Sequence, residues 1–309
     1  MKIKEVRDII SNIHLVKDSR KVYRIDKGWS SDEKYFIECD NGKKFLLRIN
    51  SIDQHDVKEK EFMIMRELSK LGIIMSYPFD VGISNKGQFV YILLSWIEGK
   101  DVEEVITTLI EDKQYSLGVE AGNILKKLHS VSAPKDQEDW EERMIKKINY
   151  HLERFKECRI KVPNDEYALK YIKENLHLLK NRPQVFQQGD FHVGNLILTP
   201  DDTLGVIDFN RWDYGDPYEE FYKMMMFSRE VSIPFARGQI YGYFGDEIPE
   251  DFFKILALYL ADVSLYSVVW AAPYGEEDVN KMLKIAEMIF NDFNNFTTVV
   301  PGWFPACPG

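Results

Sequence analysis

The stretch QQGDFHVGNLIL, residues 187–198, places an acid and a carboxamide five positions apart in a loop that contains two glycines. Thirteen residues after Asn195, an apolar stretch ends in Asp208. A carboxylate at the end of an apolar strand costs free energy unless it is paired or binds an ion. Two acids and an amide oxygen are hard ligands suited to Mg²⁺, which commonly joins carboxylates to substrate phosphates. The pattern predicts phosphoryl transfer, with Asp190 as base and Asn195 and Asp208 as metal ligands.

Each of these three residues also has a purely structural interpretation. Asp190 fits a turn cap, Asn195 a left-handed turn position, and Asp208 the cap of a following helix. For any one residue alone the structural interpretation is the better one. The order and spacing of all three together favour catalysis.

The segments GDFHVGN, VIDFN and GDPYEE together resemble the aminoglycoside phosphotransferase family, antibiotic and small-molecule kinases distantly related to protein kinases. The resemblance extends from about Val22 to about Phe227. It implies an α+β, protein-kinase-like fold, and it carries the roles of base and Mg²⁺ ligands to the same three residues. Two positions depart from the pattern: Gln188 stands where the family usually has His, and Asn210 where protein-kinase relatives have Gly.

The pattern of apolar residues predicts two domains with a hinge at about residues 95–99. Residues 1–97 form the nucleotide-binding lobe, a small antiparallel sheet of five strands with one long helix over 56–72 that ends at Gly72. Residues 98–309 form a larger, mainly helical lobe that binds the acceptor, with short strands around the opening loop.

The long helix places Glu61 on its apolar stripe, where an acid needs a cation opposite. Kinases use such a Glu to orient the residue that grips the nucleotide phosphates. Alternation along the third strand puts both Lys44 and Arg48 on one face. Arg48 is preferred because it lies deeper in the apolar run and its fork can pair with both Glu61 and a phosphate. Lys44 stays the second candidate.

Two further segments are predicted to bind the nucleotide. The turn GWSSDE would cover the phosphates, with Gly28 permitting close approach and Ser30 offering donors, although it lacks the G-x-G-x-x-G pattern. In the resembling family, backbone groups at positions matching Ser95 and Ile97 hydrogen-bond the adenine or guanine of the nucleotide. Backbone contacts do not distinguish ATP from GTP, so the donor is either one.

Acids that follow the opening loop are candidates for acceptor binding. Asp213, Glu219 and Glu220 come soon after Asp208, and Asp262 lies in an otherwise apolar helix. In the resembling family, acids from these regions line a negative cleft that holds an amine-rich antibiotic. The alternative is that the acids near residue 219 only complement the dipole of a helix start.

Composition sets the remaining expectations. The chain has 309 residues, 45% hydrophobic and 29% charged, as in a soluble globular protein. A net charge of −10 disfavours a nucleic-acid partner and suits a cationic one. We see no signal peptide and no membrane span, and expect a cytoplasmic monomer. Three widely spaced cysteines suggest neither disulfides nor zinc.

The sequence thus predicts a Mg²⁺-dependent kinase that transfers the γ-phosphate of ATP or GTP to a hydroxyl of a cationic antibiotic. An aminoglycoside is the first candidate for this acceptor. Two alternatives stay open. One is a kinase of another small molecule, such as a macrolide, choline or homoserine. The other is an inactive pseudokinase that serves as a binding module. Gln188 and Arg48, which depart from the usual residues at their positions, support this alternative.

Overall fold

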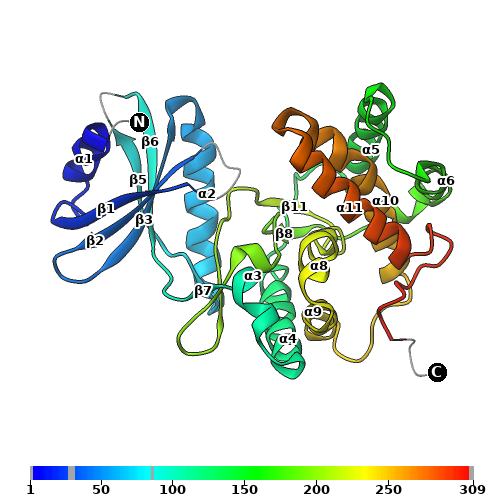
Figure 1. Ribbon diagram of the computed structural model, residues 1–309. Helices are drawn as coiled ribbons and strands as arrows, with labels where there is room; N and C mark the ends of the chain where they lie inside the picture. Colours follow the sequence, from blue (N-terminus) through cyan, green and yellow to red (C-terminus); the bar gives the residue numbers. More distant parts are fainter. Residues whose placement is uncertain (1–2, 27–31, 85–86, 306–309) are drawn as a thin grey trace. The chain divides into compact units, whose positions relative to one another are not determined.

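The computed structural model describes residues 3–26, 32–84 and 87–305, which form two compact units of α+β structure (Figure 1). Unit 1 consists of Met1–Lys100 and Ile197–Asn210, and unit 2 of Asp101–Leu196 and Arg211–Gly309. Unit 1 is therefore discontinuous in sequence. The sequence analysis had assigned its second segment, which carries Asp208, to the other domain.

The main sheet of unit 1 is antiparallel and has the strand order β1-β2-β3-β6-β5. Residues alternate between its two faces, as the sequence pattern predicts for a half-buried strand. In the β2–β3 register Lys34 lies directly opposite Arg48. The strands are β1 (Ser19–Ile25), β2 (Glu33–Cys39), β3 (Lys44–Ser51), β5 (Pro78–Ser84) and β6 (Phe89–Ser95).

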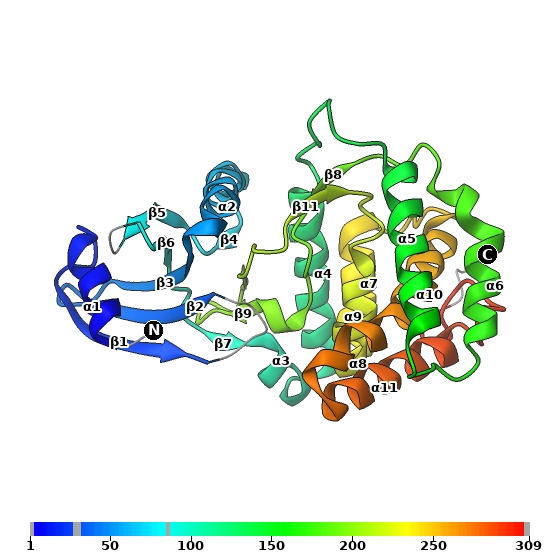
Figure 2. The same ribbon diagram turned by 90° about the horizontal axis from the view of Figure 1, so that it is seen from above.

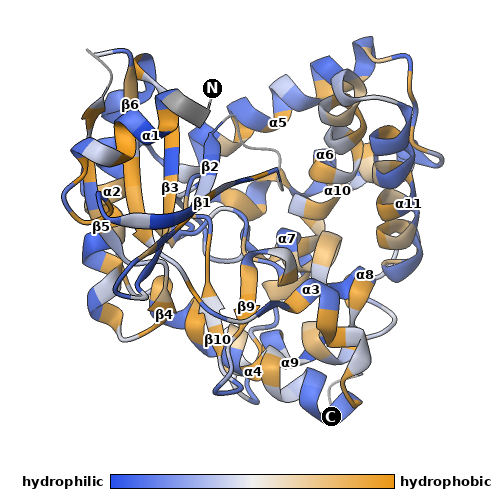
Figure 3. Cartoon of the chain, turned by 60° about the vertical axis from the view of Figure 1, so that its left-hand side comes forward, coloured by the Kyte–Doolittle hydropathy of each residue, from blue (hydrophilic) through white to orange (hydrophobic). Residues whose placement is uncertain are grey.

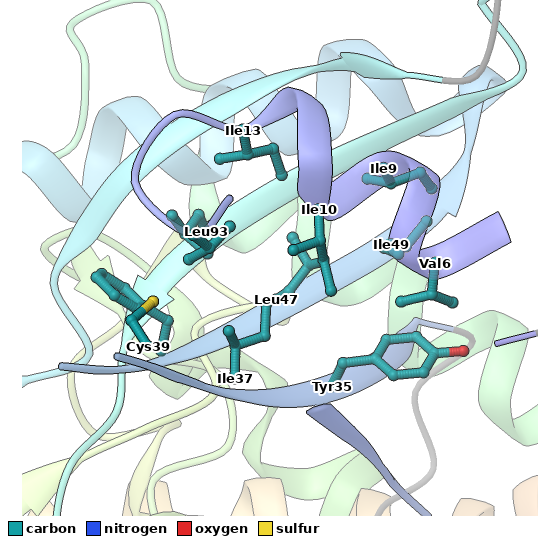
Figure 4. Close-up of a cluster of buried hydrophobic side chains, with 12 residues drawn as sticks. Val6, Ile9, Ile10, Ile13, Tyr35, Ile37, Cys39, Leu47, Ile49 and Leu93 are labelled. Carbon is teal, nitrogen blue, oxygen red and sulfur yellow. The ribbon is translucent and has the colours of Figure 1, made fainter. Parts of the chain in front are cut away.

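One face of this sheet is covered by the short helix α1 (Ile3–Asn12), and Figure 4 shows the apolar side chains between them. Ile9 of α1 and Ile13, directly after the helix, pack with Tyr35 and Leu47 of the strands, and all four are buried. Figures 1 and 2 show α2 (His55–Leu68) on the side of the sheet away from α1. Leu46 and Arg48, which alternate with Leu47, therefore face the α2 side.

The predicted end of the long helix is confirmed. A 3-10 turn, Ser69–Leu71, follows α2, and Gly72 closes it with φ of 65°. This left-handed conformation is one that glycine adopts at no steric cost.

A second sheet of unit 1 was not predicted. Strand β4 (Ile74–Met75) pairs in parallel with β10 (Leu204–Val206), and the strand order is β4-β10-β9-β7. Strands β9 (Leu196–Leu198) and β7 (Lys100–Asp101) lie where the chain passes from one unit to the other. Figure 3 shows hydrophobic residues along β9 and β10. This pairing explains why the segment around Asp208 belongs to unit 1.

Unit 2 is mainly helical, and its strands β8 (Val185–Gln187) and β11 (Asp213–Gly215) form an antiparallel pair. Residues 102–108 form one α-helical turn followed by a 3-10 turn. The helices are α3 (Val102–Val105), α4 (Glu111–Leu128), α5 (Trp140–Glu157), α6 (Asp165–Asn175), α7 (Phe221–Lys223), a π-helical segment (Met224–Ser228), α8 (Arg229–Val231), α9 (Ile233–Phe244), α10 (Phe252–Ala271) and α11 (Glu276–Asp292).

Helices α4 and α9 lie side by side with glycines at their contact (Figures 1 and 2). A Cβ at Gly118 of α4 would lie 2.1 Å from the carbonyl oxygen of Phe235, and one at Gly242 of α9 would lie 2.1 Å from that of Val119. Only residues without a Cβ allow backbones to approach so closely. Directly after α4, His129 Nδ1 lies 2.9 Å from the hydroxyl of Tyr243 in α9.

The expectation that the chain has no span long and apolar enough to cross a membrane is wrong. Residues Phe252–Tyr274, which include α10, meet that criterion by length and composition, and 72% of the apolar window is buried inside the protein. The helix packs against α5, α6 and α11. It therefore has the position of a core helix, which passes the same test as a membrane span.

Candidate functional site

The loop that follows β8 is fixed through its backbone by a buried carboxylate. Glu220 accepts hydrogen bonds from the N–H groups of Gln188, at 3.1 Å, and Gly189, at 2.6 Å. His129 Nε2 lies 2.9 Å from the same carboxylate. The close contact of α4 and α9 thus positions His129 beside Glu220. Glu220 in turn holds the backbone immediately before Asp190.

Two amide side chains complete the loop. Gln188, which is fully buried, accepts a hydrogen bond from the N–H of Asp190 at 2.7 Å. Asn195 Nδ2 donates to the carbonyl oxygen of Asp190 at 2.9 Å. Because the nitrogen of Asn195 is engaged inside the loop, its Oδ1 is the atom left to serve as an oxygen ligand.

The carboxylate of Asp190 has two cationic or polar neighbours in unit 2. Lys223 Nζ lies 2.8 Å from Asp190 Oδ1, and His192 Nε2 lies 3.6 Å from it. His192 Nδ1 accepts from the N–H of Gly194, so the neutral ring carries its proton on Nε2, toward Asp190. Burial acts to raise the pKa of Asp190, but the His192 hydrogen bond and the Lys223 charge outweigh it and hold that pKa well below its usual value. Asp190 is therefore ionised, and its side chain is 20% exposed.

Lys223 was missed by the sequence analysis. It ends α7, and the π-helical segment follows it directly. In the same segment Ser228 Oγ accepts a hydrogen bond from the N–H of Val193 in the loop. The only signal in the sequence was a lysine within the apolar run FYKMMMF, and its direction toward Asp190 does not follow from that run.

In unit 1 the expected contact between Arg48 and Glu61 is present. Arg48 Nη1 donates to Glu61 Oε1 at 2.7 Å, and both side chains are buried. Burial acts to lower the pKa of Arg48, but the nearby carboxylates outweigh it and hold that pKa above its usual value. The guanidinium is therefore charged although the side chain is only 2% exposed.

Two buried partners of this pair were not predicted. Arg48 Nε donates to Asp32 Oδ2 at 2.7 Å, and Lys58 Nζ lies 2.8 Å from Asp32 and 3.0 Å from Glu61. Burial acts to raise the pKa of Asp32, but Arg48 and Lys58 lower it below its usual value. Two cations and two anions thus offset each other. We call Asp32, Arg48, Lys58 and Glu61 the buried ion cluster.

Asp208 lies beside this cluster, in the same unit. Its φ is 59°, a left-handed conformation that is uncommon for residues other than glycine, although Asn, Asp and His adopt it more often than the others. Its carboxylate contacts Lys34 Nζ at 3.1 Å and Arg48 Nη1 at 3.5 Å. Such backbone strain clusters at functional sites. Lys34 is a further cation that the sequence analysis missed.

The other residues predicted to contact the nucleotide have partners of their own or lie outside the described part of the chain. Lys44 pairs with the exposed Glu98. The N–H of Ser95 donates to the carbonyl oxygen of Tyr77 at 2.8 Å, and the side chain of Ile97 packs against Gly205 in the second sheet. Gly28 and Ser30 lie outside the described residues.

The predicted acceptor acids do not share one exposed surface. Glu220 holds the loop before Asp190 from within, and Asp262 is fully buried with His151 Nδ1 at 2.8 Å. Their assignment to acceptor binding is therefore wrong, because a buried, paired acid cannot receive a substrate cation. The same argument applies to Glu219, which is buried and contacts Lys147 at 3.0 Å and Gln187 Nε2 at 2.9 Å. Asp213, which is exposed, contacts Arg143.

Asp216 is also internal. Arg182 Nε donates to its Oδ2 at 2.7 Å, and the hydroxyl of Tyr259 donates to the same atom at 2.6 Å. Asp216 Oδ1 accepts a hydrogen bond from the N–H of Tyr218 at 3.0 Å, so Asp216 caps the turn that leads into α7.

The two predicted magnesium ligands have the required chemistry, and one lies in each unit. Asn195 presents an amide oxygen in unit 2, and Asp208 presents a carboxylate in unit 1. Within residues 3–26, 32–84 and 87–305, no three His, Cys, Asp or Glu residues gather as a metal-binding group. Hard oxygen donors fit Mg²⁺, which completes its coordination with water and phosphate.

Residues 21–253 match the sequence model of the phosphotransferase enzyme family. The chain belongs to this family. A search of curated proteins gives no match. Among solved structures, the GDP and kanamycin complex of an aminoglycoside phosphotransferase, APH(2'')-IIIa, superposes with a TM-score of 0.71 at 12% identity, covering 93% of this chain and 97% of the other.

Two other phosphotransferase structures are similar. ADP-bound APH(2'')-Ib gives a TM-score of 0.63 at 17% identity, covering 94% of this chain and 99% of that one. The ternary complex of a thermostable APH(4)-Ia mutant with ADP and hygromycin B gives 0.67 at 14%, covering 89% and 95%. At such identities the likeness shows the fold. The predicted α+β, kinase-like fold of the phosphotransferase family is confirmed.

Proposed function

We propose that this phosphotransferase moves the γ-phosphate of ATP or GTP to a hydroxyl group of a small molecule, with Asp190 as the base. The observation that carries the proposal is the state of Asp190. Its carboxylate is ionised, partly exposed and held by Lys223 and His192, in a loop whose backbone Glu220 fixes. A turn residue alone would need none of these supports.

In the proposed reaction the acceptor oxygen forms a bond to the γ-phosphorus while the bond from that phosphorus to the bridging β–γ oxygen breaks. The nucleoside diphosphate leaves with the bonding electrons, and the hydroxyl proton passes to Asp190. Phosphoryl transfer has a loose transition state that needs little push from the nucleophile. A carboxylate of low pKa therefore suffices, because its main contribution is to orient the hydroxyl by accepting its hydrogen bond.

Asn195 and Asp208 are the proposed ligands of Mg²⁺, which when bound would neutralise charge on the phosphates. Support comes from the fixed amide of Asn195 and from the left-handed backbone of Asp208. Arg48 and Glu61 are the proposed pair of unit 1 that orients the phosphates of the nucleotide. Gly28, Ser30, Ser95 and Ile97 remain proposed contacts, with Lys44 as the alternative cation.

An aminoglycoside is the first proposed acceptor class. Its support is the similarity of fold to proteins whose structures hold kanamycin and hygromycin B. Of the acids predicted to receive its amines, Asp213 stays the candidate, because its side chain is exposed. A macrolide, choline or homoserine is the alternative acceptor. We propose that the protein acts as a soluble monomer in the cytoplasm.

The test is a phosphorylation panel. Purified protein receives ATP or GTP, with and without Mg²⁺, and kanamycin, gentamicin, hygromycin B, erythromycin, choline or homoserine, and nucleoside diphosphate release is measured. We expect turnover with an aminoglycoside and its loss in Asp190→Asn. Turnover only with another acceptor would overturn the aminoglycoside assignment. Nucleotide binding without turnover of any acceptor would favour the pseudokinase.

A further inference from the structure

The guanidinium of Arg48 is enclosed by three carboxylates of unit 1. Its Nε and Nη2 donate to Asp32, and its Nη1 donates to Glu61 and lies near Asp208. Each of the three nitrogens therefore already faces a protein carboxylate. With a side chain 2% exposed, Arg48 has the position of a buried cross-link between β3, α2 and the start of β2.

Two other lysines near this face contact carboxylates other than Asp208. Lys58 Nζ lies between Asp32 and Glu61 and is buried, so it completes the buried ion cluster. Lys44 stands at the start of β3 and pairs with Glu98. A third lysine contacts Asp208 itself.

That lysine is Lys34 of β2. It lies opposite Arg48 in the β2–β3 register, so both side chains are on the same face of the sheet. Lys34 Nζ lies 3.1 Å from Asp208 Oδ2, and the two side chains are 14% and 22% exposed, more than any member of the buried ion cluster. The Lys34–Asp208 pair is therefore the part of this charge network that solvent, and a ligand, can reach.

We propose that Lys34, rather than Arg48 or Lys44, is the cation that binds the phosphates of the nucleotide. The inference rests on the proposed function and moves the phosphate contact from β3 to the neighbouring strand. A cation at Asp208 would repel the Lys34 ammonium, and phosphate oxygens between them would remove that repulsion. A lysine suits this place because its compact charge on a flexible stem can turn from a carboxylate to a phosphate. Arg48 then has a different task, which is to hold Glu61 and Asp32 in place.

The experiment compares the binding of nucleosides with that of nucleoside diphosphates. Isothermal titration calorimetry with Mg²⁺ measures the Kd of ADP, GDP, adenosine and guanosine for the full chain. The variants are Lys34→Met, Lys34→Gln and the matched control Lys60→Met, which removes an exposed lysine of α2. We expect both Lys34 variants to weaken the preferred diphosphate by about tenfold to a hundredfold, with the nucleoside unchanged.

Equal diphosphate affinity in Lys34→Met and the wild-type protein would overturn the inference while leaving the proposed function intact. An equal loss for nucleoside and diphosphate would also overturn it, because that result indicates general damage to the unit. If Lys34→Met does not fold, Lys34→Gln, which keeps a polar group beside Asp208, decides by the same criterion. A wild-type protein that binds neither ADP nor GDP would instead contradict the proposed function itself.

Discussion

The ammonium of Lys223 lies 2.8 Å from Asp190 Oδ1, so the proposed base shares its carboxylate with a lysine from the helix that follows β11. The lysine is buried and the carboxylate is only partly exposed. Charge-assisted contacts of this kind are short and strong, and they fix a side chain as well as its protonation state.

Lys223→Met is expected to move the acid limb of the kcat/KM profile to higher pH. A neighbouring cation favours the ionised carboxylate, so its removal raises the pKa of Asp190. The measurement is kcat/KM from pH 3 to 9, with Lys223→Arg as the control that keeps the charge. An acid limb that stays in place in Lys223→Met would contradict the role of Lys223.

The same pair has a consequence for stability. Because the pKa of Asp190 is lower in the folded protein than the unfolded value of about 3.9, its ionisation stabilises the fold above about pH 4. This contribution disappears as the pH falls through the folded-state pKa. Urea titrations at pH 7 should show a lower free energy of unfolding for Lys223→Met than for the wild-type protein.

Glu220→Gln is expected to lower both stability and kcat. The substitution removes the charge that the N–H groups of Gln188 and Gly189 and the ring of His129 contact, at a cost of about 1.5–3 kcal/mol. Urea unfolding measures the first effect, and the nucleotide KM should change little because unit 1 is untouched. Glu230→Gln, at an exposed position, is the control. A Glu220→Gln protein with wild-type stability would show that this carboxylate does not hold the loop.

Gly118→Ala is expected to destabilise the protein by about 1–3 kcal/mol or more, since the added methyl would overlap the backbone of α9. The helix propensity of alanine would by itself act in the opposite direction. Thermal unfolding measures the result, with Lys126→Ala on the exposed side of α4 as the control. A rise in Tm for Gly118→Ala would mean that α4 and α9 do not approach as described.

Arg48→Met is expected to cost about 3–5 kcal/mol, because it removes the guanidinium that Asp32 and Glu61 both contact and leaves two buried carboxylates beside the ammonium of Lys58. Arg48→Lys should recover only part of this, since one ammonium cannot replace a guanidinium that contacts two carboxylates at once. The free energy of unfolding is measured beside Lys146→Met, which removes an exposed ion pair and should change it by under about 1 kcal/mol. Similar losses in the two Met variants would argue against the buried ion cluster.

Much of the fold could be predicted because it follows local periodicity. Alternation along Lys44–Ser51 separates the side chains facing α1 from those facing α2, and Gly72 ends the long helix as expected. Strand β4 could not be predicted, because its two residues carry no period and its partner β10 lies far along the chain. The discontinuity of unit 1 follows from that pairing, so it was missed as well.

In the candidate site, too, residues set by local spacing could be predicted and those set by long-range contacts could not. Asp190, Asn195 and Asp208 stand at characteristic spacings, and the Arg48–Glu61 contact followed from an acid on an apolar stripe. The partners Lys34 and Lys223 were invisible because they meet their carboxylates through the tertiary fold, 174 residues apart in the case of Lys34 and Asp208. Glu220 and Asp262 were misassigned because composition does not distinguish an acid that lines a surface from one buried against a histidine.

Because β4 pairs in parallel with β10, the chain cannot be divided into its two units by a single cut. The chain enters unit 1 twice, so neither unit corresponds to one uninterrupted stretch of gene. A fragment that stops near residue 97 would lack β10 and Asp208, and would leave β4 without its parallel neighbour. Exchange of acceptor specificity by recombination would therefore have to carry over the segment Ile197–Asn210 with unit 1, rather than join two pieces end to end.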